Sequence, residues 1–304
     1  MLCHAERHPE FHFQLSIPGR MDYLLINPSA GQATSGDTWS ALLLEQGIDL
    51  NGRIIGDLSE LPLLGEQDRL LAAGGDGTMS RVAPWCAKQG CILGVLPAGT
   101  GNDFARGLGI PLDPQAACRN IATGVVRKTD LGRVGDKVFL NVAHVGLGSE
   151  ISRQVSSSDK RWLGRLSYIR RVMERLESRR GFKATIRCDD FTIRDRWLEI
   201  AVANGSSFGG GHPVVNATPF DGQLHVIAVR PRSPGQLISA WIKVHLLDAS
   251  PSEADMMEAR GEHCEIVDCH RQPIAADGEP AGHAPIKFTV LPGALRVIVP
   301  SSDN

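Results

Sequence analysis

Apolar positions in the first 130 residues fall into short continuous runs, a pattern typical of parallel strands that are buried on both faces. The runs cover residues 23–26, 69–73 and 91–96, and each ends in a turn rich in glycine, proline or small polar residues. Residues 39–46, after the first run, have a spacing compatible with a helix. Alternating strands and helices predict a parallel α/β sheet whose ligand lies at the carboxyl ends of the strands.

After about residue 125 the pattern changes to shorter β-like runs separated by turn signals such as Asp221-Gly222 and Asp277-Gly278. Short strands at this spacing favour an antiparallel sandwich or barrel. The predicted strands are residues 138–142, 184–188, 197–203, 224–229, 265–267, 288–291 and 295–299.

The two patterns predict three parts in the chain. We expect an N-terminal extension at residues 1–20, a Rossmann-like α/β domain at 21–128, and a mainly antiparallel β-sandwich domain at 129–304 whose last strand could return to the first domain. Residues 160–180 are predicted to form a helix that carries eight lysines and arginines. These charges form either a solvated face or a surface that docks on anionic membrane headgroups.

Composition narrows the class of protein. With 304 residues, 42% hydrophobic and 22% charged, the chain is predicted to be soluble and globular, neither disordered nor a polytopic membrane protein. A net charge of −2 gives no general attraction to nucleic acid. The seven cysteines are scattered without a CxxC pair, and the first 20 residues lack the apolar stretch of a signal peptide. We therefore expect reduced thiols in a cytoplasmic protein rather than a disulfide scaffold.

The sharpest local signal is the run Gly74-Gly75-Asp76-Gly77-Thr78, between a predicted strand and a helix. Successive glycines let backbone N–H groups turn toward an anion, and a helix N-terminus adds its positive dipole end. The run is neither a P-loop nor a GxGxxG turn, and it has no lysine. Asp76 is suited to recruit Mg²⁺ or orient a hydroxyl, and Thr78 to donate to a phosphate oxygen. An ordinary strand-to-helix turn is the alternative.

Four motifs along the chain together carry a family resemblance. The motifs are Asn-Pro-Ser-Ala-Gly at 27–31, Gly-Gly-Asp-Gly-Thr at 74–78, Pro-Ala-Gly-Thr-Gly-Asn-Asp-Phe-Ala at 97–105 and Asp-Gly-Glu-Pro at 277–280. In this order they resemble the diacylglycerol kinase catalytic-domain superfamily, above all its soluble bacterial lipid kinases, which are related to sphingosine and ceramide kinases. Gly-Gly-Asp-Gly-Thr alone would also fit NAD kinases.

The resemblance implies a two-domain lipid kinase with its active site in the cleft between the domains. Such an enzyme transfers the γ-phosphate of ATP, with Mg²⁺, to the hydroxyl of a lipid alcohol such as diacylglycerol. The implied catalytic residues are Glu279 as general base, Asp277 beside it, and Asp76. The implied nucleotide contacts are Asn27, Gly74, Gly75, Asp76, Gly77, Thr78, Met79, Ser80 and Thr100.

Chemistry agrees with the role implied for Glu279, because a lipid hydroxyl needs a carboxylate within reach to accept its proton. Residues 277–279 alone would fit a hairpin turn, and only the order of the motifs favours the site. The resemblance also implies a structural Mg²⁺ held by the Asp221 carboxylate and the carbonyls of Thr218 and Gln223. Asp221-Gly222 fits a turn as well, and a single carboxylate makes a weak metal site.

The chain departs from the family pattern at three places. Ser80-Arg81 replaces an Asn-Glu pair, and Pro84 falls inside the expected helix, which it should kink. Ile54-Ile55 stands where a threonine commonly contacts the nucleotide. These changes concern adenosine contacts and affinity more than the chemistry.

Two further patterns have competing interpretations. Gly205-Ser206-Ser207-Phe208-Gly209 fits GxSxG, but glycines and a proline follow where a nucleophile elbow needs a helix, so a glycine-rich loop is the better interpretation. His263-Cys264 and Cys269-His270 flank a predicted strand of the sandwich and have the residue types of a zinc site, although structural roles are favoured.

Lipid kinase is therefore the favoured function. The alternatives are an NAD kinase-like enzyme of soluble metabolites and a degenerate nucleotide-binding regulator, which Ser80-Arg81 and Ile55 favour. The expected partner is a lipid alcohol at a membrane surface, reached by peripheral contact through residues 160–180, and no nucleic acid is expected. The sequence does not indicate which lipid is the acceptor, because an apolar pocket has no polar residues whose pattern would identify it. It also does not fix the oligomeric state, a homodimer being one option.

Overall fold

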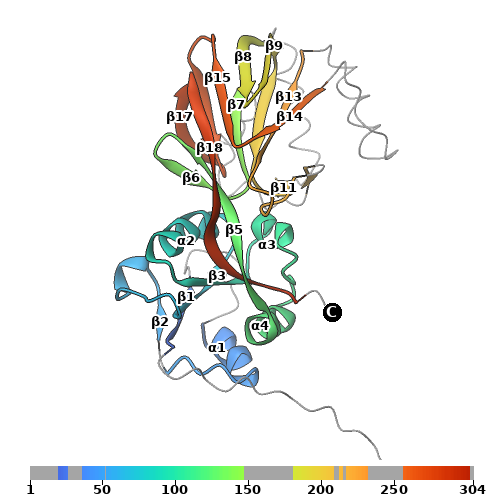
Figure 1. The fold of residues 1–304 in the computed structure, drawn as a ribbon. Helices are drawn as coiled ribbons and strands as arrows, with labels where there is room; N and C mark the ends of the chain where they lie inside the picture. The colour runs from blue at the N-terminus through green and yellow to red at the C-terminus, as the bar shows by residue number, and fades with distance from the viewer. Residues whose placement is uncertain are drawn as a thin grey trace, which may run out of the picture.

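Two domains are stacked one on the other, and the strands β5 and β18 run through both (Figure 1). The computed structural model describes residues 20–26, 36–51, 53–146, 181–208, 212–214, 217–231 and 256–301. The motif at 27–31, the helix predicted within 160–180 and nearly all of the expected N-terminal extension lie outside these residues. Within the described part, no helix has the length and apolar character needed to cross a membrane.

The N-terminal domain contains the predicted parallel sheet. Its strand order is β2-β1-β3-β4, followed by β18, which is parallel to β4, and then by β5, which is antiparallel to β18. The elements are β1 (Asp22–Ile26), α1 (Gly36–Glu45), β2 (Ile54–Ile55), the 3₁₀ helix η1 (Leu58–Glu60), β3 (Arg69–Gly74), α2 (Asp76–Gln89), β4 (Ile92–Pro97), α3 (Asp103–Gly107), α4 (Pro114–Thr123) and β5 (Val125–Val134).

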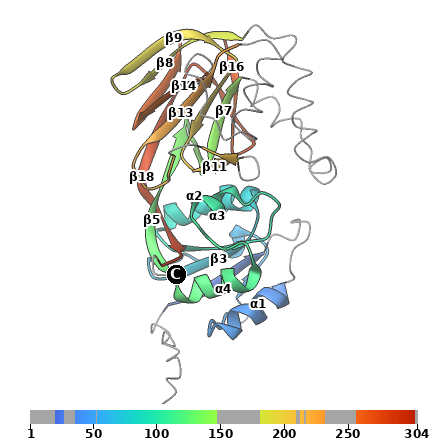
Figure 2. The ribbon, with the colours of Figure 1, turned by 90° about the vertical axis from the view of Figure 1, so that its right-hand side faces the viewer.

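Helices cover both faces of this sheet (Figure 2). The helices α2 and α3 pack on the face turned toward the other domain, and α1 and α4 pack on the opposite face. Every residue of β3 and β4 is buried as a result. Burial on both faces explains why these strands are continuous apolar runs in the sequence.

The helix α2 continues as one helix through Pro84. It ends at Gly90, which has a left-handed φ of 76° and donates its N–H to the carbonyl of Cys86. Glycine adopts this conformation without the steric cost of a side chain. Pro84 therefore does not end the helix that begins at the glycine-rich loop.

The C-terminal domain is a sandwich of two mainly antiparallel sheets around one large core. One sheet has the order β14-β13-β10-β7-β16-β17, and the other consists of β18-β15-β8-β9, with β5 paired to β18 and β6 paired to β5. The elements are β6 (Lys137–Phe139), β7 (Val142–Gly146), β8 (Phe182–Cys188), β9 (Phe191–Trp197), β10 (Glu199–Ala203), β11 (Ser207–Phe208), β12 (His212–Pro213), β13 (Leu224–Val229), β14 (Met256–Gly261), β15 (His263–Val267), β16 (Gln272–Ala276), β17 (Glu279–Ala284) and β18 (Ile286–Val299). The predicted fold class is thus confirmed.

Some predicted strand limits are wrong. The strands expected at 288–291 and 295–299 are one strand, β18, with an irregularity in its pairing between Leu291 and Leu295. Gly293 lies in this irregularity with a φ of 57°. In the sequence, the residues around it therefore look like a turn between two separate strands. The run at 138–142 is divided between β6 and β7, and the run at 197–203 between β9 and β10.

A buried carboxylate fixes the place where the two domains meet. Asp130, in the middle of β5, is 5% exposed and accepts the N–H groups of Gly222 and Gly293, each at 2.7 Å. Next to it, the Thr129 hydroxyl donates to the carbonyl of Pro219 at 2.8 Å. These bonds join β5 to β18 and to the loop before β13. The paired strands β5 and β18, here called the ribbon, are thus fixed to the sandwich.

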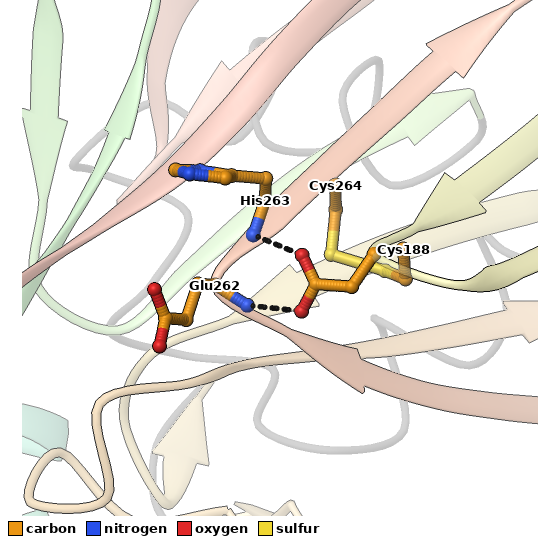
Figure 3. Close-up of a disulfide and its surroundings, with 5 residues drawn as sticks. Cys188, Glu262, His263 and Cys264 are labelled. Carbon is orange, nitrogen blue, oxygen red and sulfur yellow. Dashed lines mark hydrogen bonds between the residues drawn. A yellow bond between two sulfur atoms is a disulfide. The ribbon is translucent and has the colours of Figure 1, made fainter.

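A disulfide joins Cys188 of β8 to Cys264 of β15 inside the sandwich (Figure 3). The two residues lie directly opposite each other in the antiparallel register, with their Cα atoms 4.2 Å apart, and both are 1% exposed. At the end of the same strand pair, the Asp189 carboxylate accepts the N–H groups of Glu262 and His263 at 2.9 and 3.1 Å. The expectation of reduced thiols is wrong for this pair, because strand register brings together cysteines that are 76 residues apart.

Reduction of the disulfide should destabilise the C-terminal domain by about 2–4 kcal/mol, because the cross-link lowers the entropy of the unfolded chain. Urea unfolding with and without a reductant measures this change, and Cys188→Ala should remove the effect of the reductant. Cys269→Ser, which changes a cysteine that forms no disulfide, should retain it. Identical unfolding midpoints for the oxidised and the fully reduced protein would contradict the assignment.

Candidate active site

The glycine-rich loop places free backbone donors at the start of a long helix. β3 ends at Gly74 and α2 begins at Asp76, so Gly75 is the N-cap and provides no side-chain cap. The N–H groups of Thr78 and Met79 both donate to the Gly75 carbonyl, at 2.9 and 3.0 Å. The first N–H groups of a helix have no acceptor within it, and the dipole makes this end partly positive. The start of α2 is therefore suited to bind an anion.

The two glycine-rich loops contact each other backbone to backbone. A Cβ atom on Gly75 would lie 2.9 Å from the Cα of Gly99, and one on Gly99 would lie 2.5 Å from the Cα of Gly75. Asn102 holds the second loop, because its side chain donates to the Gly99 carbonyl at 2.8 Å and accepts the Gly99 N–H at 3.0 Å. Asn102 has a left-handed φ of 54°, which asparagine tolerates better than most residues. Only glycine fits at the contact between the loops.

Gly77 differs from the two packed glycines. A Cβ atom added to Gly77 would meet nothing within 4 Å, and the residue is exposed. The first turn of α2 thus has an open space beside it, which a side chain would partly fill. Such a space next to unpaired N–H groups is what a bound phosphate requires.

Asp76 links the two loops. Its Oδ1 accepts the N–H of Phe104, in the first turn of α3, at 3.0 Å. Burial raises the pKa of Asp76, and the neighbouring charge of Asp103 raises it further, whereas the bond from Phe104 lowers it. The carboxylate therefore has a structural role at the start of α3 in addition to the ligand role predicted from the sequence.

The other residues that were predicted to contact the nucleotide differ in how exposed they are. Thr78 is 6% exposed and its side chain packs against Gly74, while Met79 belongs to the core of the domain. Thr100 is exposed on the second loop, and Asn27 lies outside the described residues. The backbone of the loop, more than its side chains, is thus available to a ligand.

The departures from the family pattern have local partners. The Ser80 hydroxyl donates to the Gly77 carbonyl at 3.1 Å, within the first turns of α2. Arg81 forms an exposed ion pair with Asp57, 3.2 Å between Nη2 and Oδ2, and so joins α2 to the N-cap of η1. Neither side chain closes the open space beside Gly77.

The Asp277-Gly278 motif is both a hairpin turn and a structural link. It joins β16 to β17 as a two-residue loop in which φ is 48° at Asp277 and 87° at Gly278. Positive φ values at both central residues are those of a type I′ turn. The turn interpretation is therefore confirmed, and the role of these residues in a site stays a prediction.

The Asp277 carboxylate is directed to the backbone before β7. It accepts the N–H groups of Leu140, Asn141 and Val142, at 2.6, 2.9 and 3.2 Å. Burial raises the pKa of Asp277 to about 6, the three N–H bonds oppose this, and the charge of Asp76 raises it further. The last effect shows that the two aspartates, from different domains, lie within electrostatic range of each other.

Glu279, the first residue of β17, is exposed and has no hydrogen bond or ion pair within the described part of the chain. Its carboxylate is thus available to a substrate. Next to it, Lys137 of β6 donates from Nζ to the Pro280 carbonyl at 2.5 Å. This lysine thus adds a positive charge beside the hairpin. Sequence reasoning did not select Lys137, since exposed lysines are too common to signal a role.

A series of hydrogen bonds connects the two halves of the site. The Ser207 hydroxyl donates to the Asp103 carbonyl at 3.0 Å and so ties β11 to the start of α3. Asn204, which is fully buried, donates its side-chain N–H groups to the carbonyls of Asp130 and Leu140 at 3.0 and 2.9 Å. Asn204 was not selected from the sequence, and Ser207 was considered there only as part of the GxSxG pattern, because the partners of both are distant along the chain.

The metal site implied at Asp221 does not match its surroundings. The Asp221 Oδ2 lies 2.9 Å from Nε2 of His225, and its Oδ1 accepts the Gln223 N–H at 3.0 Å. A cation held by this carboxylate and by the carbonyls of Thr218 and Gln223 would compete with the His225 contact. No cluster of three or more His, Cys, Asp or Glu residues suited to a metal occurs among the described residues. The Asp221 site stays a prediction.

The competing patterns find structural explanations. Ser207 lies in the short strand β11, which pairs with β12, and its hydroxyl is bonded to Asp103, so it does not have the setting of a hydrolase nucleophile. Cys264 forms the disulfide, so its thiolate is not available to the zinc site considered at His263-Cys264 and Cys269-His270.

Comparison with known proteins agrees with the motifs. The diacylglycerol kinase catalytic domain family matches residues 23–134, and the YegS C-terminal NAD kinase beta sandwich-like domain family matches residues 141–299. A Pseudomonas aeruginosa PAO1 protein named "Probable lipid kinase YegS-like" is 33% identical over 236 residues, 77% of each chain. One of the same name from Klebsiella pneumoniae strain 342 is 30% identical over 269 residues, 85% of this chain and 89% of that protein.

Solved structures resemble the fold over nearly its whole length. A Bacillus anthracis str. Sterne crystal structure superposes with a TM-score of 0.73 at 25% identity, covering 92% of this chain and 96% of that chain. A diacylglycerol kinase structure from the same organism gives a TM-score of 0.66 at 20% identity with the same coverage. Two family models in order, together with these relatives, place the chain in the diacylglycerol kinase catalytic-domain family, among its YegS-like members.

Proposed function

We propose that this protein is an ATP-dependent lipid kinase that phosphorylates the hydroxyl of a lipid alcohol, with diacylglycerol as the first candidate. The observation that carries the proposal is the pairing of an anion site at the start of α2 with an exposed carboxylate, Glu279, from the other domain. Asp76 and Asp277, which lie within electrostatic range, connect these two halves. Membership of a family whose relatives are named lipid kinases supports the same activity.

The donor half of the site binds the phosphates through the backbone. Open space lies beside Gly77 in the first turn of α2, and the contact between Gly75 and Gly99 keeps the two loops together. Phosphoryl transfer depends mainly on positioning and on neutralising charge, so a rigid backbone cradle contributes directly. Lys137 would add positive charge from the sandwich side.

Asp76 is the residue best placed to hold Mg²⁺ beside these phosphates. Mg²⁺ in kinases is usually bound by one or two carboxylates together with substrate phosphates, so the absence of a larger acidic cluster among the described residues is compatible with it. Bound there, the ion would neutralise the negative charge that develops on the phosphates.

The acceptor half performs the proton transfer. Glu279 accepts the proton of the lipid hydroxyl. At the same time, the hydroxyl oxygen of the lipid attacks the γ-phosphorus of ATP and ADP leaves. Asp277 is a positioning residue, because its carboxylate holds the turn against the backbone of residues 140–142. Peripheral contact with a membrane through residues 160–180, which lie outside the described residues, stays a prediction.

The activity is tested by incubating the protein with radiolabelled ATP and Mg²⁺ and a panel of lipid alcohols in mixed micelles. We expect label in a phosphorylated lipid, with diacylglycerol, phosphatidylglycerol and a sphingoid base as the first acceptors. Label in NADP from NAD, without lipid, would identify an NAD kinase-like enzyme instead. Nucleotide binding without transfer to any acceptor would identify a regulator.

Gly77→Ala should raise the Kd for ATP about tenfold or more, because the new methyl group projects into the space meant for phosphate. The same change should leave stability equal or higher, since alanine is a better helix former by about 1 kcal/mol. Calorimetric titration and thermal unfolding measure the two effects. Gly65→Ala, in another exposed loop of the same domain, is the control and should bind ATP normally. Normal ATP affinity in Gly77→Ala would place the phosphates elsewhere.

Glu279→Gln should lower kcat by about 10²–10⁴-fold on the best lipid, because glutamine keeps the shape but cannot accept the proton. The affinity for ATP should hardly change, since Glu279 lies on the acceptor half. Steady-state kinetics measures both values. Glu258→Gln, an exposed glutamate of β14, is the matched control and should keep full kcat. Full kcat in Glu279→Gln would mean that another group, with Asp76 the next candidate, is the base.

A further inference from the structure

A cavity of about 320 Å³ lies at the end of the N-terminal sheet opposite the glycine-rich loop. It opens where β3, β4 and the last part of β18 meet the end of α4 and the start of β5. β3 runs from this cavity, at Arg69, to the loop at Gly74, a span of about 17 Å. The cavity is therefore distinct from the candidate active site. Its lining residues are Arg20, Gln67, Arg69, Ile92, Ile121, Gly124, Val125, Val126, Arg296 and Ile298.

Three arginines line this cavity, and the carboxylate of Asp22 lies close to two of them. Arg69, 4% exposed, makes a bidentate pair with Asp22, from Nε at 2.7 Å and from Nη2 at 2.5 Å. The Nε of Arg20 lies 3.6 Å from the same carboxylate. The Nη1 of Arg296 donates to the backbone carbonyls of Glu66 and Gly90, at 2.5 and 3.3 Å, and these groups carry no net charge.

A second carboxylate, that of Asp68, lies next to Arg69 in the sequence and accepts backbone N–H groups, so it keeps its charge. The two oxygens of Asp68 accept the N–H groups of Met21 and Gly65, at 2.9 and 2.7 Å. The partly negative end of α4 meets Arg69, which donates from Nη1 to the Ile121 carbonyl at 3.1 Å. The three arginines that line the cavity are therefore accompanied by two neighbouring carboxylates, those of Asp22 and Asp68, which leaves one positive charge in excess among these five groups.

The arginines also act on each other. Burial lowers the pKa of Arg20, and the positive charge of Arg69 lowers it further, against the opposing effect of Asp22. A cluster of this kind costs free energy unless an anion is added. Guanidinium groups bind phosphate with paired hydrogen bonds, and they do so most strongly where water is partly excluded.

The remaining walls are apolar. Ile92, Ile121 and Ile298 are at most 5% exposed, whereas Val125 and Val126 at the start of β5 are 44% and 45% exposed. No strand is paired with the outer edge of β5 at these two residues within the described part of the chain. The site thus combines a charged base with an apolar rim.

We propose that this arginine cavity is a second anion site, which binds a phosphate group through Arg20, Arg69 and Arg296. The phosphate could belong to a soluble phosphate ester or to the headgroup of a phospholipid whose hydrocarbon lies against Val125 and Val126. The inference does not depend on the proposed kinase activity, since it concerns binding at the other end of the sheet.

Equilibrium dialysis with radiolabelled inorganic phosphate, at low ionic strength and with the nucleotide site saturated by a non-hydrolysable ATP analogue, tests the proposal. The wild-type protein should bind one phosphate per chain at this site. Arg20→Gln together with Arg296→Gln should weaken this binding about tenfold or more, because two charge-assisted contacts are lost while the Arg69–Asp22 pair remains. Arg187→Gln together with Arg194→Gln removes two exposed arginines of the sandwich and should bind like wild type.

Competition then identifies the source of the phosphate. Dihexanoyl phosphatidic acid and sn-glycerol 3-phosphate carry the same group with and without hydrocarbon. Displacement by the lipid at about tenfold lower concentration would identify a phospholipid site, and equal displacement would identify a site for soluble phosphate esters. Phosphate uptake that is the same in wild type and the Arg20/Arg296 double variant, or no uptake in wild type, would overturn the proposal. Thermal unfolding of the double variant confirms that it is folded.

Discussion

The pairing of β5 with β18 is the constraint on which the rest of the structure depends. Each strand belongs to both domains, so the two domains are joined through a pair of hydrogen-bonded strands, the β5–β18 ribbon. Asp130 reinforces the ribbon where its pairing is irregular, by accepting N–H groups from both sides of the junction. A buried carboxylate with two such partners is costly to remove, because the donors would be left unpaired. The relative position of Asp76 and Asp277 follows from this ribbon.

The site needs this rigidity because its parts come from distant segments. In the proposed mechanism, the start of α2 binds phosphate and Glu279 of the β16–β17 hairpin acts on the acceptor. Between them, Asp76 accepts an N–H group at the start of α3, and α3 is bonded to β11 through Ser207. Hydrogen bonds thus connect the two halves of the proposed site.

Much of this could be predicted from the sequence where the signal is local. Continuous apolar runs followed by glycine-rich turns predicted β3, β4 and the start of α2 at the glycine-rich loop, because burial on both faces and a helix start leave clear patterns. β5 was missed, since Val125–Val134 is exposed over its first four residues and buried over the next four, which matches no single strand pattern. The Cys188–Cys264 disulfide and the arginine cavity could not be predicted either, because both depend on register and packing between distant segments.

The central claim is that groups from both domains form one active centre, and the titration of Asp277 tests it most directly. Carboxyl ¹³C NMR should give Asp277 a pKa of about 6 in the wild-type protein, raised by burial and by the charge of Asp76. In Asp76→Asn, which keeps an oxygen to accept the Phe104 N–H, the pKa of Asp277 should fall because a nearby negative charge is lost. An Asp277 pKa that is the same in both proteins would contradict the claim, since the two carboxylates would then not lie within electrostatic range of each other.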